Sequence, residues 1–191
     1  MKISLNEEFS SYIVRKLEIC DKVKSFDCGD ADLNDFIINE ASFYRSAMLA
    51  VSYVFENPED AGHDNIAAYF SLANDRISIT DFPDKTSFNR FRKKRFVNKK
   101  RLKSYPAVKI CRLAVDLSAR GQYVGRFLMN FIKSYFVANN KAGCRFLTVD
   151  AYKEALKFYE KNGFVAMNSD DENSDTRLLY FDLNDIADSP A

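Results

Sequence analysis

The residues whose types and spacing best suit a chemical role lie in a short polar loop at 116–125. This loop follows the apolar run 110–115 and holds Arg120, Gly121 and Gly125 before an amphipathic helix pattern begins. A glycine loop between a strand and a helix exposes backbone N–H groups at the positive end of the helix dipole, and such groups bind phosphate. The pattern therefore indicates a phosphate site, although a plain turn that needs a glycine produces the same pattern.

Two common nucleotide-binding motifs do not match this loop. No Gly-Lys-Ser or Gly-Lys-Thr follows it, as a P-loop would require, and the G-x-G-x-x-G spacing of a dinucleotide site is missing. Arg120 at the loop entrance and Arg126 in the first helical turn add positive charge that suits a polyphosphate.

The composition makes a histidine-rich metal site and a catalytic triad poor candidates for this chain. His63 is the single histidine, and it lies in the polar turn 58–64. A histidine-rich metal site is excluded and no zinc-type spacing of cysteines occurs, so no metal is expected. A serine or cysteine triad would need His63, which we interpret as a loop residue that faces solvent. Catalysis is therefore expected to use a tyrosine, a carboxylate, backbone amides and a cofactor.

The chain has the features of a cytoplasmic protein. Cys20, Cys28, Cys111 and Cys144 show no disulfide framework, so reduced thiols are expected. Charges occur throughout the N-terminal segment, and no apolar stretch is long enough to span a bilayer. Neither a signal peptide nor a membrane partner is expected.

Charge is unevenly distributed although the net charge is only +1. Segment 90–103, RFRKKRFVNKKRLK, has nine Lys or Arg and no acid, whereas 169–175 is acidic. One interpretation is that the basic segment grips RNA phosphates, and the other is that it is a solvated helix face. The candidates for an RNA contact are Arg92, Lys93, Lys94 and Arg95.

The hydrophobic patterns predict an α/β protein with a single domain over 1–191. Asp30 is the expected N-cap of the first helix, and Asn162-Gly163 is the expected end of the last. A basic helical insertion is expected at about 76–105, standing partly off the core. The expected strands are 12–20, 49–57, 65–75, 107–115, 144–150, 164–167 and 176–183. The other expected helices begin near Val124 and Tyr152, and 107–150 is expected to form a right-handed βαβ crossover.

Four segments together resemble the GNAT superfamily of N-acetyltransferases. They are RLAVD (112–116), RGQYVG (120–125), LTVDA (147–151) and ALKFYEKNGF (155–164). The loop resembles that superfamily's pyrophosphate motif, [QR]-x-x-G-x-[GA], but Tyr123 stands where glycine is usual. Within the superfamily, FDCGDADLNDFI (26–37) resembles the branch that includes toxins acetylating aminoacyl-tRNA.

The resemblance implies a mixed, mostly antiparallel sheet with flanking helices and a central parallel strand pair that splays apart. Acetyl-CoA would be the co-substrate, with its pantetheine between strands 107–115 and 144–150 and its pyrophosphate on the loop amides. The pyrophosphate motif keeps its function if Tyr123 has an ordinary helical backbone, and the Tyr123 ring has to fold away from the phosphates. The implied cofactor-binding residues are Leu113, Ala114, Val115, Arg120, Gly121, Gln122, Tyr123, Val124, Gly125 and Arg126.

The resemblance also places Tyr159 as the general acid that protonates the departing thiolate. A tyrosine with a pKa near ~10 is protonated at neutral pH and suits this task. The alternative is that Tyr159 is a core aromatic, because it lies three and four residues from Leu156 and Ala155. A backbone N–H is expected to stabilise the oxyanion, and no residue is identified as the base.

The acceptor amine stays open at this stage. It is the α-amine of a charged tRNA, a small molecule, or a protein N-terminus or lysine; in the last two cases the basic segment holds the 3′-phosphate of CoA. A third alternative is a protein that binds CoA and a partner without catalysis. A small antitoxin protein and a second copy of the chain are the further partners considered.

Overall fold

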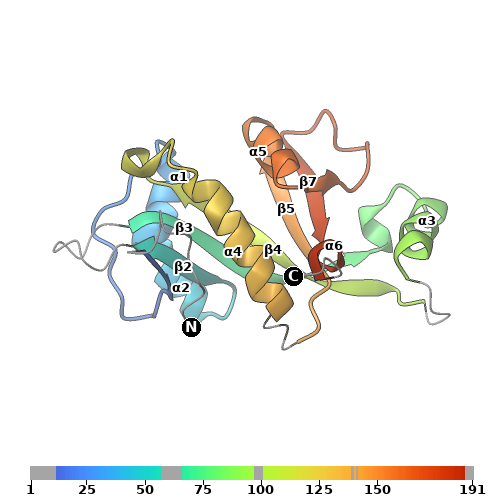
Figure 1. The fold of residues 1–191 in the computed structure, drawn as a ribbon, viewed down its shortest axis with the longest axis horizontal. Helices are drawn as coiled ribbons and strands as arrows, with labels where there is room; N and C mark the ends of the chain where they lie inside the picture. The colour runs from blue at the N-terminus through green and yellow to red at the C-terminus, as the bar shows by residue number, and fades with distance from the viewer. Residues whose placement is uncertain (1–11, 57–65, 97–100, 139, 141, 188–191) are drawn as a thin grey trace. The chain divides into compact units, whose positions relative to one another are not determined.

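The computed structural model describes residues 12–56, 66–96, 101–138, 140 and 142–187 (Figure 1). His63 and residues 97–100 lie outside the described residues. The chain divides into two compact units, one formed by Met1–Ala73 and Cys111–Leu128 and the other by Asn74–Ile110 and Met129–Ala191. Three elements, β3 (Ile66–Ser78), β4 (Ser104–Val115) and α4 (Val124–Ala138), have residues in both units.

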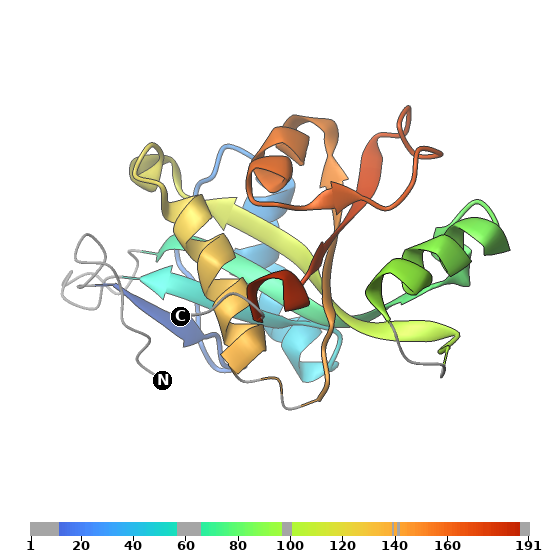
Figure 2. The ribbon, with the colours of Figure 1, turned by 45° about the vertical axis from the view of Figure 1, so that its right-hand side comes forward.

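Seven strands form one mixed sheet with the order β1-β2-β3-β4-β5-β7-β6. The pairs β1/β2, β2/β3, β5/β7 and β6/β7 are antiparallel, and β4/β5 is parallel. Figures 1 and 2 both show β5 beside β7. The predicted fold class, a mostly antiparallel sheet with one central parallel pair and flanking helices, is confirmed. The remaining strands are β1 (Ile13–Lys16), β2 (Val51–Glu56), β5 (Phe146–Tyr152), β6 (Val165–Ala166) and β7 (Thr176–Asp182).

The first unit packs one helical segment against its strands. The segment comprises α1 (Ala31–Asp35), the π-helical turn η2 (Phe36–Glu40) and α2 (Ala41–Ser46). Asp30 is its N-cap, as predicted, because its Oδ1 accepts hydrogen bonds from the amides of Asp32 (3.0 Å) and Leu33 (3.1 Å). Phe36 and its apolar neighbours cluster with Tyr69, whose hydroxyl donates to the Leu33 carbonyl at 2.7 Å.

The second unit has its own core of aromatic residues. Phe146 of β5 and Tyr180 of β7 pack with Phe88 and Phe91 from α3 (Lys85–Arg95). The helix α5 (Leu156–Lys161) follows the short turn η5 (Lys153–Ala155), and α6 (Asn184–Ala187) follows β7. The predicted end of α5 is confirmed, because Gly163 has φ +80° directly after the C-cap Asn162.

The stretch 76–105 differs from the expected helical insertion. β3 continues to Ser78, the turn η3 (Ile79–Asp81) follows, and β4 already begins at Ser104, so the helix α3 covers only Lys85–Arg95. Phe88 and Phe91 of this helix are 2% and 7% exposed and anchor it to the core of the second unit, whereas Arg90, Lys93 and Lys94 are exposed. These two aromatic residues lie three positions apart and form the buried stripe of an otherwise charged helix.

Candidate functional site

The loop that follows β4 is fixed by the carboxylate of Asp116. Asp116 Oδ1 accepts hydrogen bonds from the Ser118 amide (2.9 Å) and hydroxyl (2.6 Å), which caps the short turn η4 (Leu117–Ala119). Its Oδ2 accepts from the Asp27 amide at 2.9 Å. Burial raises the pKa of Asp116, but these hydrogen bonds outweigh burial, so the pKa lies below its ordinary value. The loop is therefore held by an ionised aspartate.

Arg120 joins this loop to the turn at Asp27–Asp30. Its guanidinium Nη2 donates a hydrogen bond to the Cys28 carbonyl, and the Leu117 amide donates to the Asp27 carbonyl at 2.8 Å. Arg120 was predicted as a cation for a polyphosphate. The structure places its guanidinium against the backbone of residues 26–30, where it connects the two segments, and its role toward a polyphosphate stays a prediction.

Tyr123 has a left-handed backbone conformation with φ +58°. The ordinary helical dihedral angles that the sequence analysis set as a condition for the motif are therefore not present at this position. A side chain in this region brings its Cβ too close to a neighbouring carbonyl, at a cost of roughly 1–2 kcal/mol, whereas glycine adopts it freely. The left-handed turn explains why the family motif has glycine here. The Tyr123 side chain is 74% exposed, in agreement with the expectation that its ring turns outward.

Helix α4 begins directly after this turn. The Phe127 amide donates to the Tyr123 carbonyl at 3.0 Å, so the preceding amides of Val124, Gly125 and Arg126 have no acceptor within the helix. The first turn of α4 contains no acidic residue, and Gly121, Gln122 and Arg126 are exposed. This helix end fits an anion such as a pyrophosphate, because its backbone donors meet no competing carboxylate from the helix itself.

The strand β4 carries the residues predicted to line the pantetheine. Ala114 is buried, whereas Leu113 and Val115 are half-buried. The parallel register of β4 with β5 covers Ala107–Lys109 opposite Phe146–Thr148, although β5 stays in register with β7 up to Tyr152. The assignment of Leu113, Ala114 and Val115 to the cofactor stays a prediction.

Tyr159 is 6% exposed and lies in α5. Its ring packs edge-on against Phe158 and Phe164, at centroid distances of 5.2 and 5.4 Å. Burial raises the pKa of Tyr159 well above its ordinary value. The structure thus gives Tyr159 the packing of a core aromatic residue and also holds its hydroxyl in the protonated form that an acid requires.

Lys133 of α4 lies under the end of α5, and the sequence analysis missed it. Its side chain is 9% exposed, and Nζ donates to the Asn162 carbonyl at 2.5 Å. Nζ also lies 4.1 Å from the centre of the Phe181 ring. Burial lowers the pKa of Lys133. The sequence feature that could have revealed it is a lysine next to Ile132 on the apolar face of the predicted amphipathic helix.

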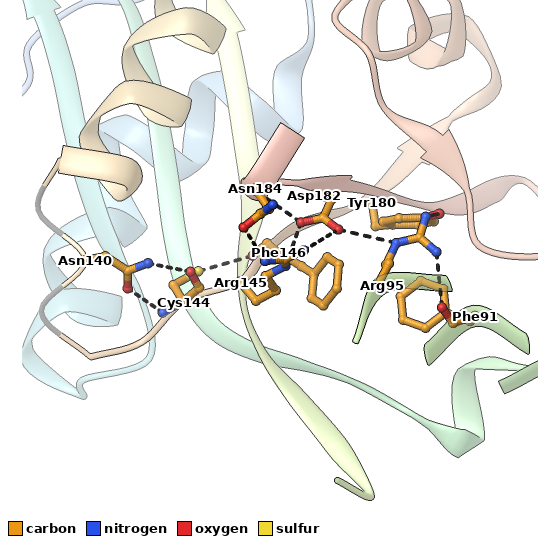
Figure 3. A network of polar contacts seen from close by, with 9 residues as sticks. All are labelled: Phe91, Arg95, Asn140, Cys144, Arg145, Phe146, Tyr180, Asp182 and Asn184. Atoms are coloured by element: carbon orange, nitrogen blue, oxygen red, sulfur yellow. Dashed lines mark hydrogen bonds and ion pairs between the residues drawn. The ribbon is translucent and has the colours of Figure 1, made fainter. Parts of the chain in front are cut away.

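The four basic candidates on α3 differ in their surroundings. Arg92 Nη1 donates to the Leu102 carbonyl at 3.3 Å, and its guanidinium lies over the Phe88 ring. Arg95 belongs to a polar network inside the second unit (Figure 3), which includes an ion pair with Asp182 at 3.4 Å. Lys93 and Lys94 are exposed. Only the two lysines therefore present their charge to solvent, while the RNA role of all four stays a prediction.

Within the described ranges, no cluster of three or more His, Cys, Asp or Glu is arranged to hold a metal ion. None of the described helices combines the length and hydropathy needed to cross a membrane.

Comparison with known proteins identifies the family. The sequence profile of the acetyltransferase (GNAT) domain matches residues 75–182. This chain belongs to the GNAT acetyltransferase family. It is an N-acetyltransferase with acetyl-CoA as its co-substrate, which confirms the family and co-substrate that the motifs at 112–125 and 147–164 predicted.

Solved GNAT structures share the fold over nearly the whole chain. A tyrosine-to-phenylalanine mutant of KacT superposes with a TM-score of 0.73 at 21% identity, over 93% of this chain and 98% of that one. AtaT complexed with acetyl-methionyl-tRNAfMet gives 0.69 at 24% identity, over 92% and 96%. A mutant of the toxin AtaT bound to the C-terminus of the antitoxin AtaR and acetyl-CoA gives 0.66 at 21%, over 93% and 96%. At these identities the comparison establishes the fold.

Proposed function

We propose that this GNAT enzyme transfers the acetyl group of acetyl-CoA to the α-amine of an aminoacyl-tRNA. The observation that carries the proposal is the exposed basic face of α3, where Arg90, Lys93 and Lys94 face solvent. Such a face suits phosphates of a nucleic acid. The fold shared with AtaT, whose complex contains acetyl-methionyl-tRNAfMet, and the resemblance of residues 26–37 to the toxin branch support the same acceptor.

The chain's own residues have separate tasks in this reaction. Acetyl-CoA, when bound, supplies the thioester whose acetyl group the amine takes. The amides of Val124, Gly125 and Arg126 hold the pyrophosphate at the start of α4. The Tyr159 hydroxyl gives its proton to the sulfur that leaves.

The acceptor amine has to be neutral when it reacts. An α-amino group has a pKa near ~8, whereas a lysine side chain has one near ~10.4, so a larger neutral fraction exists at pH 7 for the α-amine. No histidine lies in the described part of the chain to act as a base. This combination favours an acceptor of low pKa over a protein lysine.

The experiment that tests the proposal is mass spectrometry after incubation with isotope-labelled acetyl-CoA. The acceptors are aminoacyl-tRNA, free amino acids, polyamines and a lysine-containing peptide, offered separately at equal concentration. Label on the aminoacyl end of tRNA and little on the other amines is the expected result. Label on small amines or peptide alone rejects the tRNA acceptor, and no label on any amine indicates a non-catalytic CoA-binding protein.

We also propose a small antitoxin protein as a partner, in keeping with AtaT, which is described bound to the antitoxin AtaR. A homodimer also stays a proposal, and light scattering of the purified protein tests it.

A further inference from the structure

Helix α3 borders a cavity of about 350 Å³ within the second unit. The rings of Phe82 and Phe91, the hydroxyl-bearing Ser169, and the cations Arg90 and Lys94 are among the residues that line it. No Asp or Glu is among the described residues that line it. The cavity therefore combines an aromatic wall with positive charge, and its volume falls in the range of about 300–1,000 Å³ that is usual for sites of small ligands.

Three cations, Arg90, Lys94 and Arg95, line this cavity, and two of them are exposed. Arg90 and Lys94 lie four residues apart on α3, so their side chains share one helix face. Both are exposed, and neither makes a hydrogen bond or ion pair with any residue that the structure describes. An anion placed between them would meet two cations without displacing a partner.

The aromatic side chains of the cavity wall are fixed by contacts with Arg95 (Figure 3). The Arg95 guanidinium lies 4.3 Å from the centre of the Phe91 ring and 5.1 Å from that of Tyr180. Its Nη2 donates to the Tyr180 hydroxyl at 2.5 Å, and its Nε pairs with Asp182. Asp182 is 4% exposed and also pairs with Arg145 at 2.7 Å. Because Arg95 is held by Tyr180 and by Asp182, which it shares with Arg145, it shapes the wall, while Arg90 and Lys94 supply charge that has no partner among the described residues.

None of the described carboxylates of the acidic turn 169–175, which begins at the rim of the cavity, lines it or pairs with Arg90 or Lys94. The Asp171 carboxylate accepts hydrogen bonds from Arg177 Nε at 3.2 Å and from the Leu178 amide at 2.7 Å. Asn168 donates to the Asp81 carbonyl at 2.9 Å, which fixes the start of the turn. The rim is therefore ordered by hydrogen bonds in which Arg90 and Lys94 take no part.

We propose that this cavity binds a single nucleotide, with its phosphate on Arg90 and Lys94 and its base against Phe82. Phosphate contacts give affinity without reading sequence, and bases of every type stack on aromatic rings. A base has to be unpaired to enter a cavity, so the ligand is a single-stranded part of an RNA. This inference rests on the proposed RNA acceptor. The adenosine 3′-phosphate of CoA carries the same chemistry, and the test separates the two sources.

The test measures binding of two probes, a short single-stranded RNA and 3′,5′-adenosine bisphosphate, by titration at several salt concentrations. Arg90→Ser and Lys94→Ser remove one charge each, and Phe82→Leu removes the ring but keeps apolar volume. Lys85→Ser is the matched control, because Lys85 is an exposed cation on the same helix that is not among the residues lining the cavity. Each charge variant is expected to lower RNA affinity several-fold and the salt slope by about 1, and Phe82→Leu to lower affinity about tenfold.

A second readout identifies directly which part of the protein contacts the nucleobase. RNA carrying 4-thiouridine is irradiated on the wild-type protein, and the cross-linked peptide is identified by mass spectrometry. Cross-links on the peptide that contains Phe82, which disappear in the Arg90→Ser/Lys94→Ser protein, support the proposal. Wild-type affinity in that double variant, or no binding of either probe to the wild-type protein, overturns it.

The hypothesis of a nucleotide cavity and the hypothesis of a tRNA acceptor can be rejected independently of each other. If the double variant acetylates aminoacyl-tRNA at the wild-type rate and affinity, the acceptor stands and the nucleotide cavity is rejected. If only the bisphosphate binds and the variants weaken it, the nucleotide site stands and CoA is its source, while RNA is rejected as the ligand.

Discussion

Lys133 donates a hydrogen bond to the carbonyl of Asn162, the residue that ends the helix carrying Tyr159. The cation thus sits at the negative end of α5, where a positive charge is favourable. It also lies against the Phe181 ring at 4.1 Å. Since Tyr159 is the proposed acid, Lys133 is a positioning residue for it.

Lys133→Met is expected to lower kcat several-fold and to leave the KM for acetyl-CoA nearly unchanged, because α5 loses the group that fixes its end.

Burial lowers the pKa of Lys133 in the folded protein, so between this lowered pKa and 10.5 the unfolded chain binds more protons. The wild-type protein therefore gains stability relative to the variant as pH rises through that window. Urea unfolding of both proteins at pH 7 and pH 10 measures the difference, and a gap that does not change with pH contradicts the assignment.

Tyr159→Phe is expected to lower kcat by about 10²–10⁴-fold, the usual contribution of general acid catalysis. The ring contacts with Phe158 and Phe164 remain, so the free energy of unfolding is expected to change by about 1 kcal/mol or less. Steady-state kinetics and thermal unfolding of the variant check both points.

The pH profile of the wild-type enzyme tests the same role. Because burial raises the pKa of Tyr159, its hydroxyl stays protonated beyond pH 10. Activity is therefore not expected to fall between pH 8 and pH 10 through loss of this proton. A Tyr159→Phe variant with the wild-type kcat would mean that Tyr159 is only a core residue.

Tyr123→Gly is expected to stabilise the protein by about 1 kcal/mol and to keep or tighten CoA binding. The reason is the left-handed backbone at φ +58°, which is strained for tyrosine and free for glycine. Tyr123→Ala is the control, since it also removes the ring but keeps a Cβ. Chemical denaturation and calorimetric titration with CoA compare the three proteins. Equal stability of the alanine and glycine variants would show that the ring, and not the backbone, matters.

Gly125→Val is expected to abolish CoA binding without lowering stability. Valine is a better helix former than glycine, but its side chain would project toward the pyrophosphate at the start of α4. Gly121→Val is expected to act differently. Its Cβ would meet no atom within 4 Å, but φ is +82°, so stability falls by about 1–2 kcal/mol while some CoA binding remains. Titration with CoA and thermal unfolding of both variants test this contrast, and normal CoA binding by Gly125→Val would refute the cofactor site.

Long apolar patterns made much of the fold predictable. The face of α4 repeats every three to four residues, so its start at Val124 follows from the sequence. Asp30 marks the start of a helix through the hydrogen bonds of its side chain, and Gly163 marks the end of a helix through its backbone geometry. Residue type alone indicates both. β4 was harder, because its first residues lie in a polar, basic stretch and only the burial of Tyr105 shows that they belong to the sheet.

The details of the site depended on contacts between distant parts of the sequence. Arg95 donates to Tyr180, 85 positions later, and nothing in the basic run separates it from Lys94. The burial of Lys133 depends on the end of α5. The backbone angle at Tyr123 is set by the turn before α4, and its residue type argues against that angle.

The hydrogen bonds between the FDCGD segment and the cofactor loop limit how these two pieces can be exchanged between relatives. Asp116 accepts from the Asp27 amide, and Arg120 donates to the Cys28 carbonyl. Gly29 has φ +76°, a backbone conformation that residues with a side chain rarely adopt, although a Cβ there would make only ordinary contact with Arg120 Nη2 at 3.7 Å. A chimera that receives residues 116–126 from a GNAT enzyme without these two side chains would lose the connection. Because the partners in 26–30 are backbone groups, the connection depends on the Asp116 and Arg120 side chains and on the path of the 26–30 backbone, so a graft that keeps both side chains is expected to keep the connection.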